Sequence, residues 1–421
     1  MKRLLFIVAF FSIGIFAHSQ MECRSFTYRQ DLLRRSPEMA GVLQAIEVFT
    51  KNLKDSKSVT TNDGGSSGKS LTLITIPVVV HVLYNSSQQN LTDAQVRSQL
   101  DILNNDYRRQ NPDTGRTPEI FRQFAADCGI QFELAKTDPL GYATTGIIHK
   151  HTEILAFNIE DGIKFSKTGG DDAWDRDNYL NIWVGSLENG ILGYSSVVGC
   201  HKENDGIVVQ FNAFGTFGTA QAPFNGGRTT THELGHWLNL IHTWGDAFCG
   251  NDLVDDTPPQ QACHRGCPGG TQISCGNAPY GDMYMNYMDF TDDACMNIFT
   301  LGQRDRMLAL FAPGGPRYNL LFSTALTAVP KPSPANSLQD NSQAALQIFP
   351  NPATNMISVE ISNSTRVGST LEIFDGMGLK ILTTTMDSRQ QQVNIESLRS
   401  GIYYIVIVDG RTRTSFKLIK I

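Results

Sequence analysis

Apolar and polar positions along the middle of this chain follow the patterns of an α/β domain. Residues 71–84 form a nearly continuous apolar, β-branched run, which predicts a strand buried on both faces. After Thr92, apolar residues recur at helical spacing from Val96 to Tyr107, so a helix capped by the Thr92 hydroxyl should follow. Shorter apolar runs predict further strands at 130–134, 179–184 and 206–211. Helical and strand segments in this order indicate an α/β fold.

The N-terminal part of the chain follows another pattern. Two basic residues precede an apolar run at 4–17 that is too short to span a bilayer comfortably, so residues 1–19 are predicted to be a signal peptide. Residues 20–53 are polar with helical stretches, and they lead into a flexible Ser/Gly/Asp/Lys-rich tract at 54–70, a good site for proteolytic nicking. No other long apolar stretch occurs, which argues against a transmembrane segment.

A separate β-rich unit is predicted at the end of the sequence. Residues 324–345 are rich in Pro, Ser, Ala and Asn and are predicted to form a linker. Residues 346–421 alternate apolar and polar positions between turn signals at Asp375-Gly376 and Asp409-Gly410, which predicts a small antiparallel sandwich. The expected organisation is therefore a signal peptide (1–19), an N-terminal segment with a cleavable linker (20–70), a main domain (71–323), a linker (324–345) and an all-β unit (346–421).

Composition favours an exported protein that does not bind nucleic acid. The formal net charge of −6 over 421 residues provides no overall basic character for nucleic-acid binding. Eight cysteines behind a signal peptide favour disulfides over intracellular redox chemistry. Five of them lie in one Gly/Pro/Asp-rich segment, which is predicted to be a long loop stabilised by disulfides: Cys249, Cys263, Cys267, Cys275 and Cys295.

The segment His232-Glu-Leu-Gly-His-Trp-Leu-Asn-Leu-Ile-His carries the clearest chemistry. On a helix, His232 and His236 project from one face about one turn apart, so both imidazoles can bind one zinc ion. Glu233 can reach a water on the same metal, and a turn at Asn239 can bring His242 back as a third ligand. Three protein ligands leave one position open, as in catalytic zinc sites. The alternative is an amphipathic helix with incidental histidines.

Motifs downstream of the histidines add a family resemblance. The tract from Trp237 to Trp244, followed by Asp255-Asp-Thr-Pro-Pro and Asn286-Tyr-Met-Asp, resembles the pappalysin family of metzincin zinc peptidases, in its ulilysin and mirolysin type. The resemblance covers about residues 71–322. It implies an α/β (α+β) catalytic domain with a twisted mixed sheet, an active-site helix and a loop-rich C-terminal subdomain.

The same resemblance implies a role for individual residues. The family's zinc ligands match His232, His236 and His242, and its general base matches Glu233. Met288 matches the Met-turn methionine, an apolar floor under the metal. Asp293 matches the base of the pocket for the residue after the scissile bond, where a carboxylate would favour Arg or Lys. A solvated loop aspartate beside Asp292 is the alternative reading of that residue.

The loop after the metal motif contains residues that resemble a second metal site and the disulfides of the family. Carboxylates and carbonyls in a Gly/Asn-rich loop suit a hard cation, although turn formation is an alternative role for these acids. The family's calcium ligands match Asp246, Asp252, the Val254 carbonyl, Asp256 and Thr257. The family's disulfides match Cys249–Cys275 and Cys267–Cys295. Cys263 then has no family partner, which leaves a bond to Cys128 or Cys200 as an open option.

The chain departs from the family pattern at two positions. Asn239 stands where relatives carry glycine, and because asparagine tolerates the left-handed conformation, the turn should survive. Phe290 stands where relatives place a tyrosine whose hydroxyl binds the metal or steadies the tetrahedral intermediate. Loss of one such donor is expected to lower the rate by about a hundredfold without abolishing catalysis.

Cys23 lies ahead of everything that resembles the catalytic domain. A thiolate is a good zinc ligand, so Cys23 could fill the open position and displace the catalytic water, as in relatives with short propeptides. Residues 20–70 would then be an inhibitory propeptide over the cleft, with Arg24 paired to a cleft carboxylate. An unpaired thiol or an intermolecular disulfide is the alternative.

The C-terminal unit resembles the sorting domain of type IX secretion. Four motifs carry this resemblance, beginning at Ile348, Leu371, Gly401 and Phe416. It implies export through the periplasm of a Bacteroidetes-type bacterium by the type IX machinery, to a secreted or cell-surface location. A carbohydrate-binding or adhesive β-module is the alternative.

Two functional hypotheses remain at this point. The first is a secreted zinc endopeptidase, made as a zymogen, that cleaves protein or peptide substrates. The second, motivated by Phe290, is a surface adhesin whose metal domain is weakly active or inactive.

Overall fold

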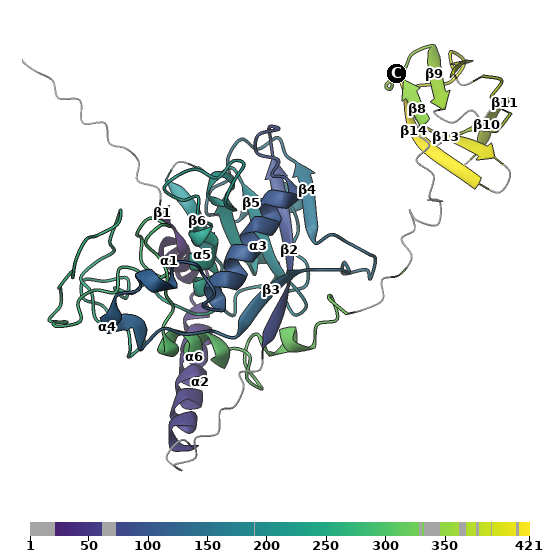
Figure 1. The fold of residues 1–421 in the computed structure, drawn as a ribbon. Coiled ribbons are helices and arrows are strands. Elements are labelled where there is room, and N and C mark those ends of the chain that lie inside the picture. Colours follow the sequence, from purple (N-terminus) through teal and green to yellow (C-terminus); the bar gives the residue numbers. More distant parts are fainter. Residues whose placement is uncertain are drawn as a thin grey trace, which may run out of the picture. The chain divides into compact units, whose positions relative to one another are not determined.

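A computed structural model of the chain describes residues 22–60, 73–188, 190–327, 331, 346–361, 368–375, 379–388, 390–409 and 412–421 (Figure 1). The chain divides into two compact units, Met1–Pro330 and Lys331–Ile421, and this boundary falls within the predicted linker. The predicted signal peptide lies outside the described residues, as do Gly376 and Gly410 of the predicted turns.

The first unit is built on a mixed sheet with the strand order β1-β6-β7-β5-β2-β3, and β4 also pairs with β2. The strands are β1 (Glu22–Cys23), β2 (Ile74–Tyr84), β3 (Ile130–Leu134), β4 (Ile147–His151), β5 (Leu180–Gly185), β6 (Ile191–Ser195) and β7 (Ile207–Gln210). All neighbouring strands are parallel except β6 and β7. The predicted mixed α/β fold is therefore confirmed, and four predicted strands are present with ends shifted by at most three residues.

Two helices cover one face of this sheet (Figure 1). Val78, Val80 and Val82 of β2 belong to the main core, together with apolar residues of α3 (Asp93–Tyr107) and α5 (Arg228–Trp237). Thr92 caps α3 as predicted, because its hydroxyl accepts a hydrogen bond from the Gln95 amide at 3.2 Å. Val79 and Leu83 point to the opposite face, as expected from the alternation of side chains along a strand.

The N-terminal segment packs against this unit through helices. They are α1 (Ser25–Arg35) and α2 (Met39–Thr60), and α2 contacts α6 (Leu301–Ala309), as Figure 1 shows. Because α2 extends to Thr60, the prediction of a flexible tract is wrong for residues 54–60, and residues 61–70 lie outside the described residues. Tyr28, Met39, Leu43 and Ile46 of this segment are buried. The shorter helices are α4 (Glu119–Arg122), η1 (Thr114–Arg116), η2 (Gly162–Lys164), η3 (Ser166–Thr168), η4 (Lys202–Asn204), η5 (Phe211–Ala213) and η6 (Tyr318–Phe322). Among the described residues, no helix has the length and apolar character that a bilayer crossing requires.

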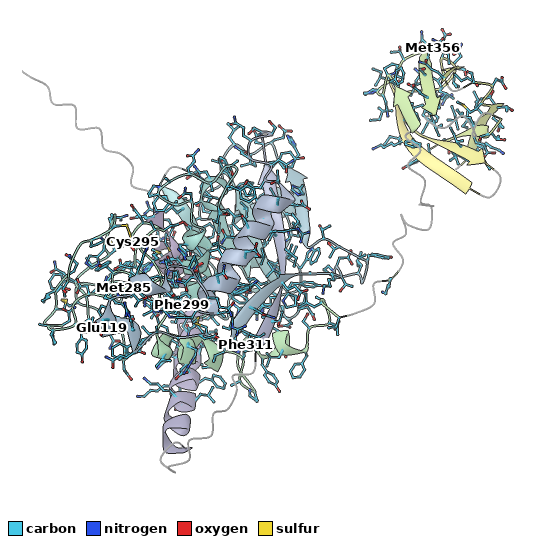
Figure 2. All side chains as sticks on the ribbon, in the orientation of Figure 1. Glu119, Met285, Cys295, Phe299, Phe311 and Met356 are labelled. Atoms are coloured by element: carbon cyan, nitrogen blue, oxygen red, sulfur yellow. A yellow bond between two sulfur atoms is a disulfide. The ribbon has the colours of Figure 1, made fainter. Side chains whose placement is uncertain are left out.

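A long loop region follows α5. Residues 238–300 are all described and contain no helix or strand, in agreement with the predicted loop-rich subdomain. Met285 and Phe299 are nevertheless buried, and Figure 2 shows them with Cys295 on the side of the unit where the long loops lie. Buried apolar side chains and disulfides, rather than the backbone hydrogen bonds of helices or strands, stabilise this region.

The second unit is an antiparallel β-sandwich, as predicted. One sheet has the order β11-β10-β13-β14 and the other the order β12-β9-β8. The strands are β8 (Leu346–Phe349), β9 (Met356–Ile361), β10 (Thr370–Asp375), β11 (Lys380–Thr385), β12 (Gln390–Asn394), β13 (Gly401–Asp409) and β14 (Thr412–Lys420). Val359, Ile373 and Ile405, from both sheets, share one buried core.

Candidate metal centre

Helix α5 and the turn after it bring three histidines together. His232 and His236 lie one turn apart on α5, and the chain reverses at Asn239, whose φ of 72° is left-handed. The reversal returns His242 to the same point. The Nε2 atom of His236 lies 3.1 Å from that of His232 and 3.0 Å from that of His242.

The opposite ring nitrogens show which protons these histidines carry. The Nδ1 atom of His232 lies 2.7 Å from the Tyr287 carbonyl, and that of His236 lies 2.9 Å from the Leu240 carbonyl. The Nδ1 atom of His242 contacts the Asp246 carboxylate. Nδ1 therefore donates in the two carbonyl contacts. With all three Nδ1 atoms occupied by these partners, the Nε2 lone pairs are free to bind one metal ion.

Burial keeps the three rings neutral. It lowers the pKa of His232, with a contribution from neighbouring His242, to about 3, and it lowers the pKa of His242 to about 3. The pKa of His236 lies well below its usual value for the same reason. Converging neutral imidazoles with oriented outer nitrogens are the donor set that a divalent metal requires, so these residues fit zinc.

Cys23 completes the group. Strand β1 pairs with β6 so that Cys23 lies opposite Gly193, and its sulfur and the three imidazole ligand atoms all lie within 4.8 Å of one another. Burial and the neighbouring Glu233 raise the pKa of the Cys23 thiol well above its usual value. A thiolate at this position therefore needs a cation beside it, and four N and S donors suit a closed tetrahedral site.

Glu233 is buried beside the histidines and in contact with the N-terminal segment. Its Oε2 accepts a hydrogen bond of 2.7 Å from the Ser25 hydroxyl, which itself accepts one of 2.8 Å from the Ser195 amide. Burial raises the pKa of Glu233 to about 8. Gly193 permits this arrangement, because a Cβ there would lie 3.0 Å from Glu233 Cγ. Nothing in the sequence pattern pointed to Ser25.

Met288 and Phe290 line the metal centre from the loop side. Met288 is fully buried under α5, and its sulfur would clash with any Cβ at Gly235, which explains the glycine inside the motif. The Phe290 ring centroid lies 4.8 Å from that of His242 and 5.6 Å from that of His232. Phe290 therefore packs against two of the three histidine rings.

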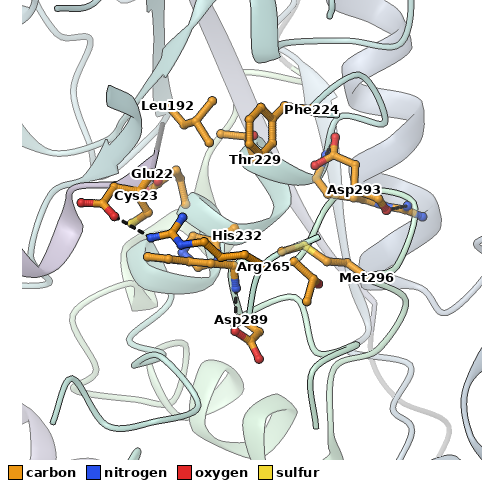
Figure 3. Close-up of a pocket in the computed structure, with 14 residues that line it drawn as sticks. Glu22, Cys23, Leu192, Phe224, Thr229, His232, Arg265, Asp289, Asp293 and Met296 are labelled. Atoms are coloured by element: carbon orange, nitrogen blue, oxygen red, sulfur yellow. Dashed lines mark hydrogen bonds and ion pairs between the residues drawn. The ribbon is translucent and has the colours of Figure 1, made fainter. Parts of the chain in front are cut away.

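Asp293 lines a cavity next to the metal centre (Figure 3). Asp293 is only 3% exposed, which excludes the solvated loop alternative. Its Oδ2 accepts hydrogen bonds from the amides of Gly226 at 2.7 Å and Arg228 at 3.1 Å, at the start of α5. Burial raises the pKa of Asp293 to about 6. The cavity thus offers a buried acidic group within the same pocket as His232.

Four of the five expected calcium residues lie near one another, and Asp246 contacts His242 instead. Thr257 donates to Asp252 at 2.7 Å and to the Val254 carbonyl at 3.0 Å, so these three lie together. Asp256 lies near Val254, because a Cβ at Gly302 would lie 2.6 Å from Asp256 Oδ1 and 2.7 Å from Val254 Cγ1. The Asp256 carboxylate also accepts from the Gly302 amide at the start of α6, whereas Asp246 contacts His242. The structure brings together only part of this set.

The cysteines of the loop form the two disulfides that the resemblance implies, Cys249–Cys275 and Cys267–Cys295. Cys263, Cys128 and Cys200 are free thiols, so the considered bonds to Cys263 are wrong. Cys128 and Cys200 are buried, where free cysteines pack as small apolar side chains. The expected pairing of Arg24 with a cleft carboxylate is also wrong, because Arg24 pairs with Glu22 of its own segment at 3.0 Å.

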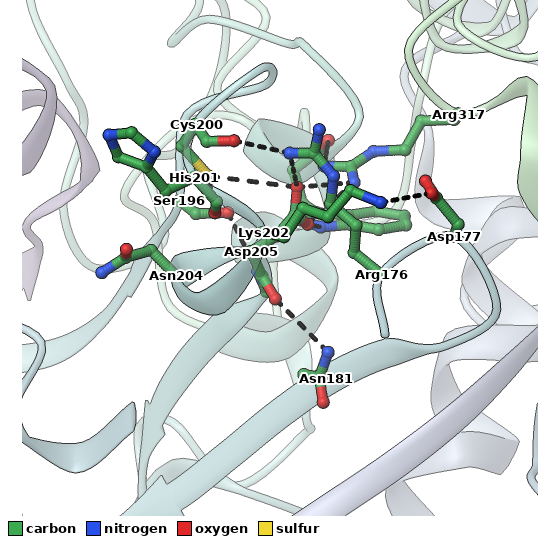
Figure 4. A network of polar contacts seen from close by, with 12 residues as sticks. Arg176, Asp177, Asn181, Ser196, Cys200, His201, Lys202, Asn204, Asp205 and Arg317 are labelled. Carbon is green, nitrogen blue, oxygen red and sulfur yellow. Dashed lines mark hydrogen bonds and ion pairs between the residues drawn. The ribbon is translucent and has the colours of Figure 1, made fainter. Parts of the chain in front are cut away.

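A buried ionic network fixes the end of α5 immediately after His236 (Figure 4). Asp205 accepts from Trp237 Nε1 at 2.7 Å and from Arg317 Nη1 at 2.7 Å and 2.9 Å. The Arg317 guanidinium lies 3.7 Å from the centre of the Trp237 ring. These contacts join residues far apart in sequence and orient the helix end, and no local pattern indicated them.

Comparisons with known families agree with this geometry. The family described as pregnancy-associated plasma protein-A matches residues 165–312, and a secretion-system C-terminal sorting domain matches residues 347–421. An extracellular metalloprotease of Pyricularia oryzae is 35% identical over 249 residues, which are 57% of this chain and 75% of that protein. One from Verticillium alfalfae is 31% identical over 247 residues, 56% of this chain and 76% of that protein.

Solved structures give the same result. Mature mirolysin of Tannerella forsythia in complex with a cleaved peptide is 45% identical, with a TM-score of 0.58, over 59% of this chain and 96% of that chain. A promirolysin mutant from the same organism is 40% identical, with a TM-score of 0.64, over 71% of this chain and 97% of that chain. The chain is therefore similar both to a mature and to a precursor form.

Proposed function

The chain belongs to the pappalysin family of zinc metallopeptidases, with a type IX sorting domain that marks it as secreted or cell-surface, and we propose that it is a latent endopeptidase. His232, His236 and His242 would hold the zinc ion. The observation that carries the proposal is the convergence of three neutral imidazole nitrogens beside the buried carboxyl group of Glu233. The N-terminal segment would be the inhibitory propeptide, because Cys23 reaches the same point.

The residues of the site divide the reaction between them. When bound, zinc supplies Lewis acidity that polarises water and the scissile carbonyl. Glu233 would take the proton of the attacking water at Oε2, the atom that Ser25 contacts, and later donate it to the leaving amine. The edge of β6 would align the substrate, because the carbonyls of Gly190 and Gly193 already accept backbone hydrogen bonds from Glu22 and Arg24.

Removal of the metal tests this proposal directly. After cleavage in the tract at 54–70 and release of the N-terminal segment, the zinc-loaded protein is expected to cut an unfolded protein. A strong zinc chelator should abolish the cleavage, and added zinc should restore it, because zinc supplies the Lewis acidity that polarises the carbonyl. Fragments are measured by mass spectrometry. If the zinc-loaded protein leaves every unfolded substrate intact, the adhesin hypothesis motivated by Phe290 replaces this one.

Asp293 is proposed to select Arg or Lys after the scissile bond. Its burial makes an ion pair with a basic side chain stronger than on the surface. Asp293→Asn is expected to lower kcat/KM for peptides with Arg or Lys at that position by about tenfold or more, with little change for apolar residues. The cleavage map of a peptide library measures this, with Asp292→Asn as the matched control. An unchanged map for Asp293→Asn would show that Asp293 does not select the residue after the scissile bond.

Calcium remains a proposal for the site around Asp252. Burial disfavours the charged form of Asp252 and raises its pKa to about 7. A bound cation would stabilise the carboxylate form. Calcium binding needs that form, which predominates above pH 7. Added calcium is therefore expected to raise the Tm of the zinc-loaded protein more at pH 8 than at pH 6, by differential scanning calorimetry. The absence of a shift at pH 8 would leave Asp252 and Thr257 as turn residues only.

A further inference from the structure

Arg265 occupies the same cavity as the metal ligand His232 and Asp293, but on a different wall (Figure 3). Its Nη2 lies 2.8 Å from Oε2 of Glu22, the residue before Cys23. Its guanidinium carbon lies 5.5 Å from the centre of the Phe290 ring. The Phe290 ring stabilises the guanidinium by a cation–π contact. The guanidinium therefore faces the N-terminal segment, where Glu22 lies.

Strand pairing places the Glu22 carboxylate at this point. Glu22 lies opposite Ile191 on the edge of β6, and its amide donates to the Gly190 carbonyl at 3.1 Å. A peptide that replaces β1 on this edge and runs parallel to β6, as β1 does, would present side chains at the same positions along β6. The N-terminal segment thus shows how a bound peptide can deliver a carboxylate to Arg265.

Release of the N-terminal segment leaves Arg265 without this partner. Glu22 provides the one ion pair that Arg265 makes with the described residues. The nearby carboxylate of Asp289 is already used, because it accepts from the His264 amide at 2.7 Å and from Gln260 at 2.9 Å. The freed guanidinium would face the cleft, where it can form a new charge-assisted pair.

We propose that Arg265 is a specificity-determining residue that binds a carboxylate of the peptide substrate close to the scissile bond. This inference rests on the proposed function. The carboxylate lies on the side of the bond that enters the Asp293 cavity, because Glu22, Arg265 and Asp293 line one space. The cavity then selects by two opposite charges, with Asp293 for a basic side chain and Arg265 for an acidic group. The acidic group is either a Glu or Asp side chain or the free C-terminus of the peptide.

Paired peptides test this assignment on the mature, zinc-loaded protein. Each pair differs only by Glu or Gln at one position near the cleaved bond, and each peptide is made with a free and with an amidated C-terminus. The expected result is a kcat/KM about five- to tenfold higher for the peptide with the carboxylate, a modest factor because Arg265 is partly exposed. A preference that follows Glu identifies a side chain, and one that is lost on amidation identifies the terminus.

Variants of Arg265 distinguish recognition from other roles. Arg265→Gln is expected to bring the ratio of the paired peptides to about one, whereas Arg265→Lys keeps part of the preference. Arg97→Gln, on the exposed surface of α3, is the matched control. The inference is overturned if the ratio survives in Arg265→Gln, or if both peptides slow equally. Failure of the wild-type protein to cut any substrate would instead overturn the proposed function.

Discussion

Replacing Glu233 by glutamine is expected to lower kcat for peptide cleavage by about 10²- to 10⁴-fold, the range for loss of a positioned general base. Glutamine has nearly the same shape and can still accept the Ser25 hydrogen bond, so the fold around α5 should persist. It cannot take a proton from water. Initial rates with a fluorogenic peptide measure the effect after the N-terminal segment has been removed.

Two controls distinguish the loss of the general base from the loss of zinc binding or of the fold. The zinc content of Glu233→Gln should remain at one ion per chain, because His232, His236 and His242 are unchanged. Glu188→Gln, an exposed glutamate, should cleave at the wild-type rate. If Glu233→Gln retains wild-type kcat with zinc bound, another group acts as the base and the proposed mechanism is wrong.

The histidine motif could be predicted because its geometry is local. Helical spacing alone places His232 and His236 on one face, and the left-handed tolerance of asparagine accounts for the reversal at Asn239. The core strands were predictable for a similar reason, since β2 is buried on both faces and its pattern is a continuous apolar run. In each case neighbouring residues determine the outcome.

The remaining contacts of the site depend on distant pairing, which a single sequence does not encode in any local pattern. Strand β6 was missed because it is only five residues long and Gly193 interrupts its apolar run, yet this glycine lets Glu233 approach. Ser25 reaches Glu233 across 208 positions of the chain. Asp205 and Arg317 meet across 112 positions. Such residues become visible only when the fold brings the segments together.

Asn239 has a second role that its backbone conformation did not suggest. Its side-chain amide donates to Glu47 of α2 at 3.2 Å, and Arg306 donates to the Asn239 carbonyl at 2.6 Å and to Glu47 at 2.7 Å. Arg306 is nearly buried in this arrangement. Asn239 therefore ties the N-terminal segment to the turn between His236 and His242.

The N-terminal segment therefore contacts the rest of its unit at two separate places around the metal centre. Cys23 and Ser25 lie at the metal centre and at Glu233, and Glu47 lies on the far side of the turn with Arg306. Backbone pairing of β1 with β6 adds a third interaction. Release requires all of these contacts to open, so the loss of any one should weaken latency without abolishing it.

Cys23→Ala is expected to speed the appearance of peptidase activity in the full-length protein by about tenfold or more, since a loss of about 1.4 kcal/mol of closed-state stability already increases the open fraction tenfold. Alanine removes the fourth donor from the metal centre and keeps the strand pairing of β1. The time course of activity after purification measures the effect, and the double variant Cys23→Ala with Glu47→Gln should activate faster still. Glu38→Gln, an exposed glutamate near the start of α2, is the matched control. Unchanged latency in Cys23→Ala, together with full zinc occupancy, would mean that the contacts of Ser25 and Glu47 alone keep the cleft closed.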